Sequence, residues 1–220
     1  VLWMMAAQFD CYDVTGNKKY LECGEKALRY ISRNIKGNRI RSSYETAHTE
    51  EWRPIASESY IALLCLARSY KILKRDDIKN LIIRLRDFSF SLIDEETGAV
   101  RNCNAESKNA SLQNDENLCD LVYTQGFALN ALLGLYSVFQ KEDCYLKAKK
   151  LADWLCSVQL NENNSLIDGG WRGSYNLKLK KYNGRCNNAL EEGGSSSIYT
   201  GWCALPILMG LLKLETHLRY

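Results

Sequence analysis

The sequence predicts an all-α protein built from repeated helical hairpins. Residues 59–90 align without a gap with residues 125–156, a weaker copy of the pattern lies at 2–32, and a half-length copy lies at 199–212. A unit that recurs about every 60–70 residues, with apolar residues at helical spacing, is typical of folds in which helical hairpins stack on one another.

Apolar residues recur at the helical period in seven segments. The predicted helices are 1–12, 17–35, 56–73, 76–93, 122–139, 142–160 and 197–216. The first helix of each repeat is apolar on nearly all sides, as in FALNALLGLY, whereas the second has one apolar stripe among charged residues, as in YLKAKKLADWL. A helix that is apolar all round is buried, and an amphipathic helix covers it. We therefore expect an inner layer of first helices and an outer layer of second helices, without a stretch of alternation long enough to predict a sheet.

The connections between these helices differ in length. Within a repeat they are short, as in VTGNK, LKRDD and FQKED, whereas between repeats they span roughly 36–55, 95–121 and 161–196. Because the helices alternate in direction, all three long connections should gather at the end where the inner helices begin. Long loops are commonly functional, and the N-termini of helices favour negative charge. This end is the predicted working face.

Charge, hydropathy and cysteine spacing exclude several classes of function. The net charge of +3 arises from basic residues interleaved with acidic ones, so no nucleic-acid partner is expected. No apolar run reaches the roughly 18–20 residues that cross a membrane, so no membrane partner is expected either. The nine cysteines include no C-x-x-C pair. This spacing predicts reduced thiols, a cytoplasmic protein, and neither a metal site nor a cofactor.

Two outer-helix segments resemble a known superfamily. GNKKYLECGEKALRYIS at 16–32 and QKEDCYLKAKKLADWLCSVQ at 140–159 look like the outer-helix signature of the six-hairpin glycosidase-like proteins. The resemblance implies an α/α toroid, and also a carbohydrate-active enzyme of glycoside hydrolase, lyase or epimerase type. The expected substrate is an oligosaccharide or a uronic-acid-containing glycan.

The repeats define the expected organisation of this toroid. Residues 1–220 form a single domain or a fragment of one, with repeats at approximately 1–56, 57–122, 123–196 and 197–220. Three and a half hairpins are too few to close a ring of six. We therefore expect the ring to be completed by further sequence or by a partner, which includes a second copy of this chain.

Two other functions stay open. Residues 152–159, followed by the DGGW at 168–171, are similar to the QW element of terpenoid cyclases and prenyltransferases, which implies a toroid with an apolar cavity. The D-x-D-D signature of the class II cyclases is absent, and with only His48 and His217 the zinc site of the protein prenyltransferases is hard to assemble. The third possibility is a non-catalytic helical-repeat module that binds a glycan or a protein.

Three loop carboxylates are the predicted catalytic residues. Acid/base chemistry on a glycan needs carboxyl groups on both sides of the reacting bond. Glu50 lies before the third helix, Asp120 before the fifth and Glu192 before the seventh, so that each comes from a different long connection. The alternatives are helix capping for Glu50 and Asp120 and a solvated loop for Glu192.

Aromatic rings and planar donors in the same connections are the predicted substrate contacts. The set is Trp52, Arg53, Tyr123, Gln125, Trp171, Arg172, Tyr175 and Trp202. Under the QW-like interpretation Trp171 is instead a structural plug that stacks on Gln159. Asn130, an amide within an apolar helix, needs a hydrogen-bond partner if it is buried, and a satisfied core position is the commoner outcome.

Overall fold

The computed structural model describes residues 1–41, 56–104, 115–184, 194–197 and 204–218. These residues form seven helices: α1 (Leu2–Thr15), α2 (Lys18–Arg33), α3 (Ala56–Leu73), α4 (Asp76–Ser91), α5 (Thr124–Phe139), α6 (Glu142–Ser157) and α7 (Ala204–Leu218). Each predicted helix agrees with an observed one to within three residues at either end, except the last. Helix α7 begins at Ala204, next to residues 198–203, which lie outside the described part of the chain.

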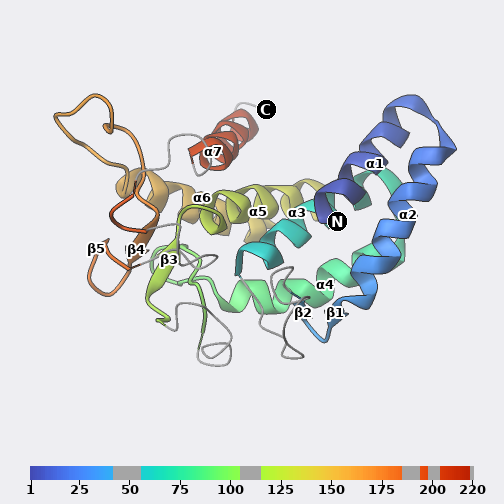
Figure 1. The fold of residues 1–220 in the computed structure, drawn as a ribbon, viewed down its shortest axis with the longest axis horizontal. Coiled ribbons are helices and arrows are strands. Elements are labelled where there is room, and N and C mark those ends of the chain that lie inside the picture. The colour runs from blue at the N-terminus through green and yellow to red at the C-terminus, as the bar shows by residue number, and fades with distance from the viewer. Residues whose placement is uncertain (42–55, 105–114, 185–193, 198–203, 219–220) are drawn as a thin grey trace.

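The helices form the two expected layers. Helices α1, α3, α5 and α7 contact one another in that order, and α2, α4 and α6 each pack on the inner helix that precedes them in the chain (Figure 1). The core lies between the layers, with Phe9 of α1, Leu63 of α3 and Leu129 of α5 fully buried. The Tyr60 hydroxyl donates to the Ser89 carbonyl at 2.7 Å and so links α3 to α4. The arrangement of inner and outer helices is confirmed.

Each hairpin turns at a residue with a left-handed backbone. Gly16, Lys74 and Gln140 have φ angles of 66°, 53° and 51°. Their backbone N–H groups donate at 2.8, 2.9 and 2.8 Å to the carbonyls of three tyrosines four residues earlier, Tyr12, Tyr70 and Tyr136. The three turns are thus equivalent, and Lys74 and Gln140 occupy the same position in the gap-free alignment of residues 59–90 with residues 125–156. Only glycine adopts this conformation without steric cost.

Replacing Lys74 or Gln140 with glycine is expected to raise the free energy of unfolding by about 0.5–1 kcal/mol, since relief of the left-handed strain outweighs the added freedom of the unfolded chain. Gly16→Ala should lower it by about 1 kcal/mol. Urea unfolding of the three variants measures both effects. A loss of stability in Lys74→Gly and Gln140→Gly would contradict the equivalence of the turns.

The first long connection begins with a short hairpin that packs on α4. Strand β1 (Ile35–Lys36) pairs antiparallel with β2 (Arg39–Ile40). The Arg84 guanidinium of α4 donates to the carbonyls of Gly37 and Ile35 at 3.0 and 3.3 Å. These bonds hold the connection beside the second half of α4, at the end where α3 begins.

The second and third long connections share one small sheet. Strand β3 (Leu118–Asp120) pairs antiparallel with β4 (Ser174–Asn176), which pairs with β5 (Lys181–Tyr182). In this register Asp120 lies opposite Ser174. The second and third long connections therefore meet beside the start of α5, as predicted for these two, whereas the β1–β2 hairpin of the first forms a separate sheet (Figure 1). The two sheets themselves are an addition to the prediction, because strands of two or three residues are too short to show alternation.

None of the described helices is long and apolar enough to cross a lipid bilayer. The free thiols of the described residues include Cys11, Cys23, Cys65, Cys119, Cys144 and Cys156. Burial raises the pKa of the Cys65 thiol to about 12, so that it packs in the core as a small apolar group.

Candidate active site at the loop-rich end

Asp120 supports the turn that leads into α5. Its carboxylate accepts from the Val122 N–H at 2.8 Å and from the Thr124 hydroxyl at 3.3 Å, and its side chain is fully buried. Its own N–H donates to the Asn102 amide oxygen at 2.9 Å. The N-cap of α5 is Tyr123, so helix capping, the alternative to catalysis, is wrong for Asp120, whose carboxylate instead braces the turn that precedes the helix. Its catalytic role stays a prediction.

Gln125 fastens the second long connection to α5. Its buried amide accepts from the Val100 N–H at 2.9 Å and donates to the Val100 carbonyl at 2.7 Å. It also donates to the Asp120 carbonyl at 3.3 Å. Backbone groups thus pair with both the oxygen and the nitrogen of the Gln125 amide. Tyr123, the residue before α5, is partly exposed at the same end of the bundle. For both residues, contact with a substrate stays a prediction.

Trp171 belongs to the third long connection, and its side chain is part of the core. Its side chain is 2% exposed, and its indole N–H donates to the Leu155 carbonyl of α6 at 2.9 Å. The Gln159 amide donates to the Gly169 carbonyl. These contacts favour the plug interpretation of Trp171, held by α6. Arg172, the next residue, is partly exposed, and its guanidinium approaches the Ser195 carbonyl at 3.5 Å.

Tyr175 lies on the other face of strand β4 from the buried Ser174. Its ring meets the rings of Trp154 and Tyr182 edge to face, with centroids 5.6 and 5.4 Å away. Burial raises the pKa of the Tyr175 hydroxyl. With Arg101, Tyr175 lines a cavity of about 330 Å³ on the side of α6. Tyr175 thus points toward the outer layer of helices.

Asp94 organises the loop on the far side of this cavity. Its carboxylate accepts from the Thr97 N–H and hydroxyl and forms an ion pair with Arg101. Burial alone would raise the pKa of Asp94, but the bonds from Thr97 and Arg101 outweigh that effect and hold the pKa below its usual value. Asp94 therefore stays ionised and paired with Arg101 in the wall of the cavity, which Glu96, Lys178 and Lys180 also line.

The structure brings some of the predicted site residues together. Asp120, Arg172 and Tyr175 come from two connections that are joined by the β3–β4 pairing, and Gln125 lies in the first turn of α5 beside Asp120. Five others lie outside the described residues: Glu50, Trp52, Arg53, Glu192 and Trp202. Within the described ranges, there is no group of three or more His, Cys, Asp or Glu side chains placed to hold a metal ion.

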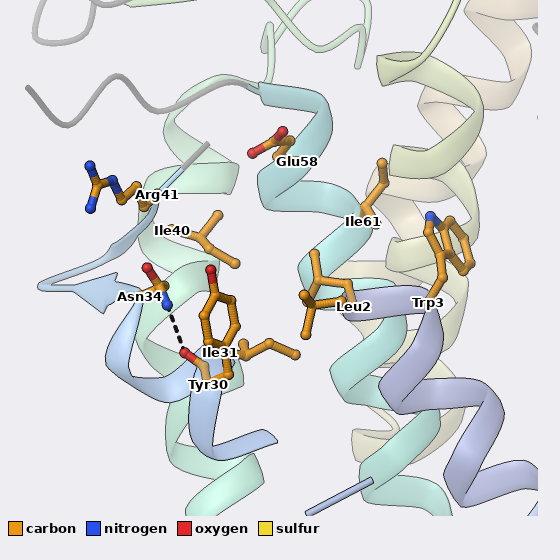
Figure 2. A pocket seen from close by; sticks show the side chains of 10 residues that line it. Leu2, Trp3, Tyr30, Ile31, Asn34, Ile40, Arg41, Glu58 and Ile61 are labelled. Atoms are coloured by element: carbon orange, nitrogen blue, oxygen red, sulfur yellow. Dashed lines mark hydrogen bonds between the residues drawn. The ribbon is translucent and has the colours of Figure 1, made fainter. Parts of the chain in front are cut away.

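A second cavity of about 400 Å³ opens where α1, α2 and α3 meet. Figure 2 shows Tyr30 on one side, Leu2 and Ile61 facing it, Trp3 beyond Ile61, and the Glu58 carboxylate above Ile61. Neither Trp3 nor Glu58 is among the site residues predicted from the sequence. Trp3 falls in a segment whose apolar pattern indicates core, and the signal for Glu58 was its place in the first turn of a predicted inner helix.

Asn130 is a satisfied polar group within the inner layer. Its amide donates to the carbonyls of Gly126 and Pro206 at 2.8 and 2.7 Å and accepts from the Lys213 ammonium at 2.8 Å. Burial, with a smaller contribution from Arg68, lowers the pKa of Lys213. Asn130 therefore links α5 to α7, as expected of a core amide.

Solved structures with the same arrangement of helices include carbohydrate enzymes. One of them is a GH76 α-mannanase of Bacteroides thetaiotaomicron. The match covers 100% of this chain and 52% of the mannanase chain, at 16% sequence identity and a TM-score of 0.69. The chain has the α/α-toroid fold. An inactive variant of the α-1,6-mannanase GH76A of Salegentibacter sp. HEL1_6, in complex with α-1,6-mannotriose, matches 99% of this chain and 55% of its own, at 16% identity and a TM-score of 0.64. The match to the cellobiose 2-epimerase of Spirochaeta thermophila covers 99% of this chain and 52% of the epimerase chain, at 15% sequence identity and a TM-score of 0.65.

These likenesses establish the fold, and the chain spans about half the length of the structures it matches. The sequence matches no protein-family model, and no curated protein matches it.

Proposed function

We propose that this chain belongs to a carbohydrate-active enzyme of glycoside hydrolase, lyase or epimerase type that acts on an oligosaccharide. The observation that carries the proposal is the match of nearly the whole chain to toroids that hydrolyse a mannan and epimerise cellobiose, two different reactions on sugars. The gathering of two long connections at the N-terminus of α5 supports a site at that end. We keep the cytoplasm as the proposed compartment, on the cysteine spacing of the sequence.

In this proposal residues 1–220 form one toroid domain, and another hairpin packs against its last inner helix. Helix α7 supports this, because Leu205, Met209 and Leu212 are 59%, 53% and 62% exposed. An apolar face of this kind is typical of an interaction surface. The hairpin that covers it comes from further sequence or from a second copy of the chain.

Proton transfer in this proposal belongs to carboxylates of the long connections. Glu50 and Glu192 are the proposed acid and base, since Asp120 is buried and both of its carboxylate oxygens already accept hydrogen bonds, one from Val122 and one from Thr124. Asp120 then acts by positioning the start of α5. Arg172 is the proposed planar donor to the glycan, together with Trp52, Arg53, Tyr123, Tyr175 and Trp202.

The reaction is tested by offering the purified chain two sugars and analysing the products. Release of mannose from α-1,6-mannotriose identifies a hydrolase, and conversion of cellobiose to its C2 epimer identifies an epimerase. Binding of either sugar without a product favours the non-catalytic module. If neither sugar binds nor reacts and the chain binds a prenyl alcohol, the terpenoid-cyclase-like alternative replaces the proposal.

Glu50→Gln and Glu192→Gln are each expected to lower kcat at least about 100-fold, because each removes a proton donor or acceptor while keeping the shape of the side chain. Glu22→Gln, on the exposed face of the outer helix α2, is the matched control and should leave kcat unchanged. Initial rates on the accepted sugar measure all three. Normal rates in both test variants would remove Glu50 and Glu192 from the mechanism.

A further inference from the structure

We infer that the cavity on the side of α6 binds a sugar unit that carries an anionic group, a carboxylate or a phosphate ester, with that group against Lys178 and Arg101. This inference rests on the proposed function, which supplies the sugar, whereas the charge of the cavity supplies the acidic group. It adds a subsite on the outer layer of helices to the site at the loop-rich end.

The cavity lies where three segments of the chain meet. Trp154 and Val158 belong to the C-terminal end of α6, and Asp94 and Arg101 to the second long connection. The turn 177–180, which joins β4 to β5, completes the lining. The volume of about 330 Å³ is at the lower end of the range of small-molecule sites, which suits a single sugar unit.

The charges that line the cavity leave one positive charge in excess. The described lining holds three cations and two carboxylates: Arg101, Lys178, Lys180, Asp94 and Glu96. Each carboxylate is paired, Asp94 with Arg101 and Glu96 with Lys180. Lys178 has neither an ion pair nor a hydrogen bond in the part of the chain that the structure describes. The unpaired charge of this lining is thus a cation, which attracts an anionic group.

The cavity also offers hydrogen-bond donors that the protein does not use. The Nη2 of Arg101 donates to Asp94, but its Nη1 makes no hydrogen bond to any described residue. The Tyr175 hydroxyl also has no partner among the described residues. Burial raises the pKa of this hydroxyl, so it stays protonated and can donate. Hydrogen bonds from a guanidinium to an anionic oxygen are among the strong ones, and a sugar hydroxyl accepts from a phenol.

Lys180 is held in a backbone conformation that costs free energy. Its φ is 50°, in the left-handed region, at the end of the turn between β4 and β5. Glycine adopts this conformation without steric cost, yet the position holds a lysine that lines the cavity. Strain of this kind is typical of functional sites. Lys180→Gly should therefore raise the midpoint of urea unfolding and, at the same time, weaken the binding of the acidic sugar.

Other ligands match the cavity less well. A neutral sugar leaves the Lys178 charge without a partner, and a cation is repelled by it. A wholly apolar ligand would desolvate the charged groups without replacing their hydrogen bonds, which costs free energy. A bare inorganic anion makes no use of the apolar part of the lining, which includes Val158 and Leu177. A pyranose with an acidic substituent has apolar C–H faces, hydroxyl edges and the negative charge.

Isothermal titration of the purified chain with three hexoses that differ only at C6 tests the inference: glucuronate, glucose 6-phosphate and glucose. At least one of the two charged sugars should bind with a Kd about tenfold or more below that of glucose, because glucose places no anionic group beside Lys178. Acetate and inorganic phosphate, which lack the sugar ring, should each bind about tenfold or more weakly than the sugar with the same anionic group.

Three variants locate the binding. Lys178→Gln should raise the Kd of the charged sugar about tenfold, because it removes the unpaired charge and keeps a polar side chain. Tyr175→Phe keeps the ring and removes the hydroxyl, so the Kd should rise about threefold or more. Lys181, exposed on β5 and outside the lining, is the matched control, and Lys181→Gln should change the Kd less than about twofold at about 0.15 M salt. Circular dichroism verifies that each variant is folded.

The results with the wild type and Lys178→Gln decide the inference. Binding of glucuronate alone identifies the anionic group as a carboxylate, binding of glucose 6-phosphate alone identifies a phosphate ester, and either supports the inference. An unchanged Kd in Lys178→Gln overturns it. Glucose that binds as tightly as the charged sugars, or a simple anion that binds as tightly as its sugar, overturns it as well.

The outcomes also separate this inference from the proposed function. If a charged sugar binds through Lys178 but the chain converts neither charged nor neutral sugars to products, the inference stands and the catalytic proposal fails. If α-1,6-mannotriose or cellobiose is converted and neither charged sugar binds, the proposed function stands and the inference fails.

Discussion

Trp171→Ala is expected to lower the free energy of unfolding by about 3–5 kcal/mol, the usual cost of truncating a buried large aromatic side chain. The indole is 2% exposed, and its N–H is paired with the Leu155 carbonyl at 2.9 Å. The substitution leaves a cavity against α6 and removes the donor of that carbonyl. Because Trp171 precedes β4 in the same connection, the sheet that joins the two long connections should lose order with it. Urea unfolding followed by circular dichroism measures the change.

Trp171→Phe is the matched control for this result. It keeps a ring in the core and removes the N–H, so the expected loss is smaller, about 1–2 kcal/mol. Had Trp171 been a substrate platform and no more, Trp171→Ala would weaken sugar binding with little change in stability. A denaturation midpoint equal to that of the wild type would therefore contradict the plug interpretation.

Gly126→Ala should lower the free energy of unfolding by about 2–3 kcal/mol, at the upper end of the usual range for overpacking. A Cβ at this position would lie 2.6 Å from the Cβ of Pro206 and 2.8 Å from the backbone nitrogen of Ile207. Both neighbours belong to α7, and the backbone atom cannot rotate away. The two inner helices would therefore have to move apart, which also weakens the bond from Asn130 to Pro206.

Gly134→Ala, two turns further along α5, provides the opposite expectation. A Cβ there would meet its nearest neighbour, the Cβ of Ala67, at 3.6 Å, an ordinary contact. Alanine is favoured over glycine in a helix, so this variant should be more stable by about 0.5–1 kcal/mol. Chemical denaturation of the pair gives the comparison. Equal effects of the two substitutions would mean that α5 and α7 are not in close contact.

The architecture could be predicted from the sequence because its cause is local. The run FALNALLGLY has no polar face, so α5 has to be buried, and the charged residues of α6 leave it one side to bury. The short sheet was not predictable in the same way. Strands of three residues, such as β3, carry no period, and their pairing joins segments more than 50 residues apart.

The candidate site was predictable in its location and less so in its detail. Position along the chain was enough to place Asp120 just before α5 and Gln125 in its first turn. That the Gln125 amide would be taken up by the backbone of Val100 depends on the path of a long connection, which no local pattern encodes. For Trp3, the local sequence pattern predicts a burial that the structure does not show. Its apolar neighbours in the sequence indicate core, and only the positions of α3 and α5 leave it 48% exposed.

Hydrogen–deuterium exchange with and without α-1,6-mannotriose tests most directly whether a glycan binds at the loop-rich end of the toroid. Binding there slows amide exchange in β3 and β4 and in the first turns of α3 and α5, while the turns at Gly16, Lys74 and Gln140 exchange as before. Protection confined to those three turns, or no protection at a saturating sugar concentration, contradicts the account.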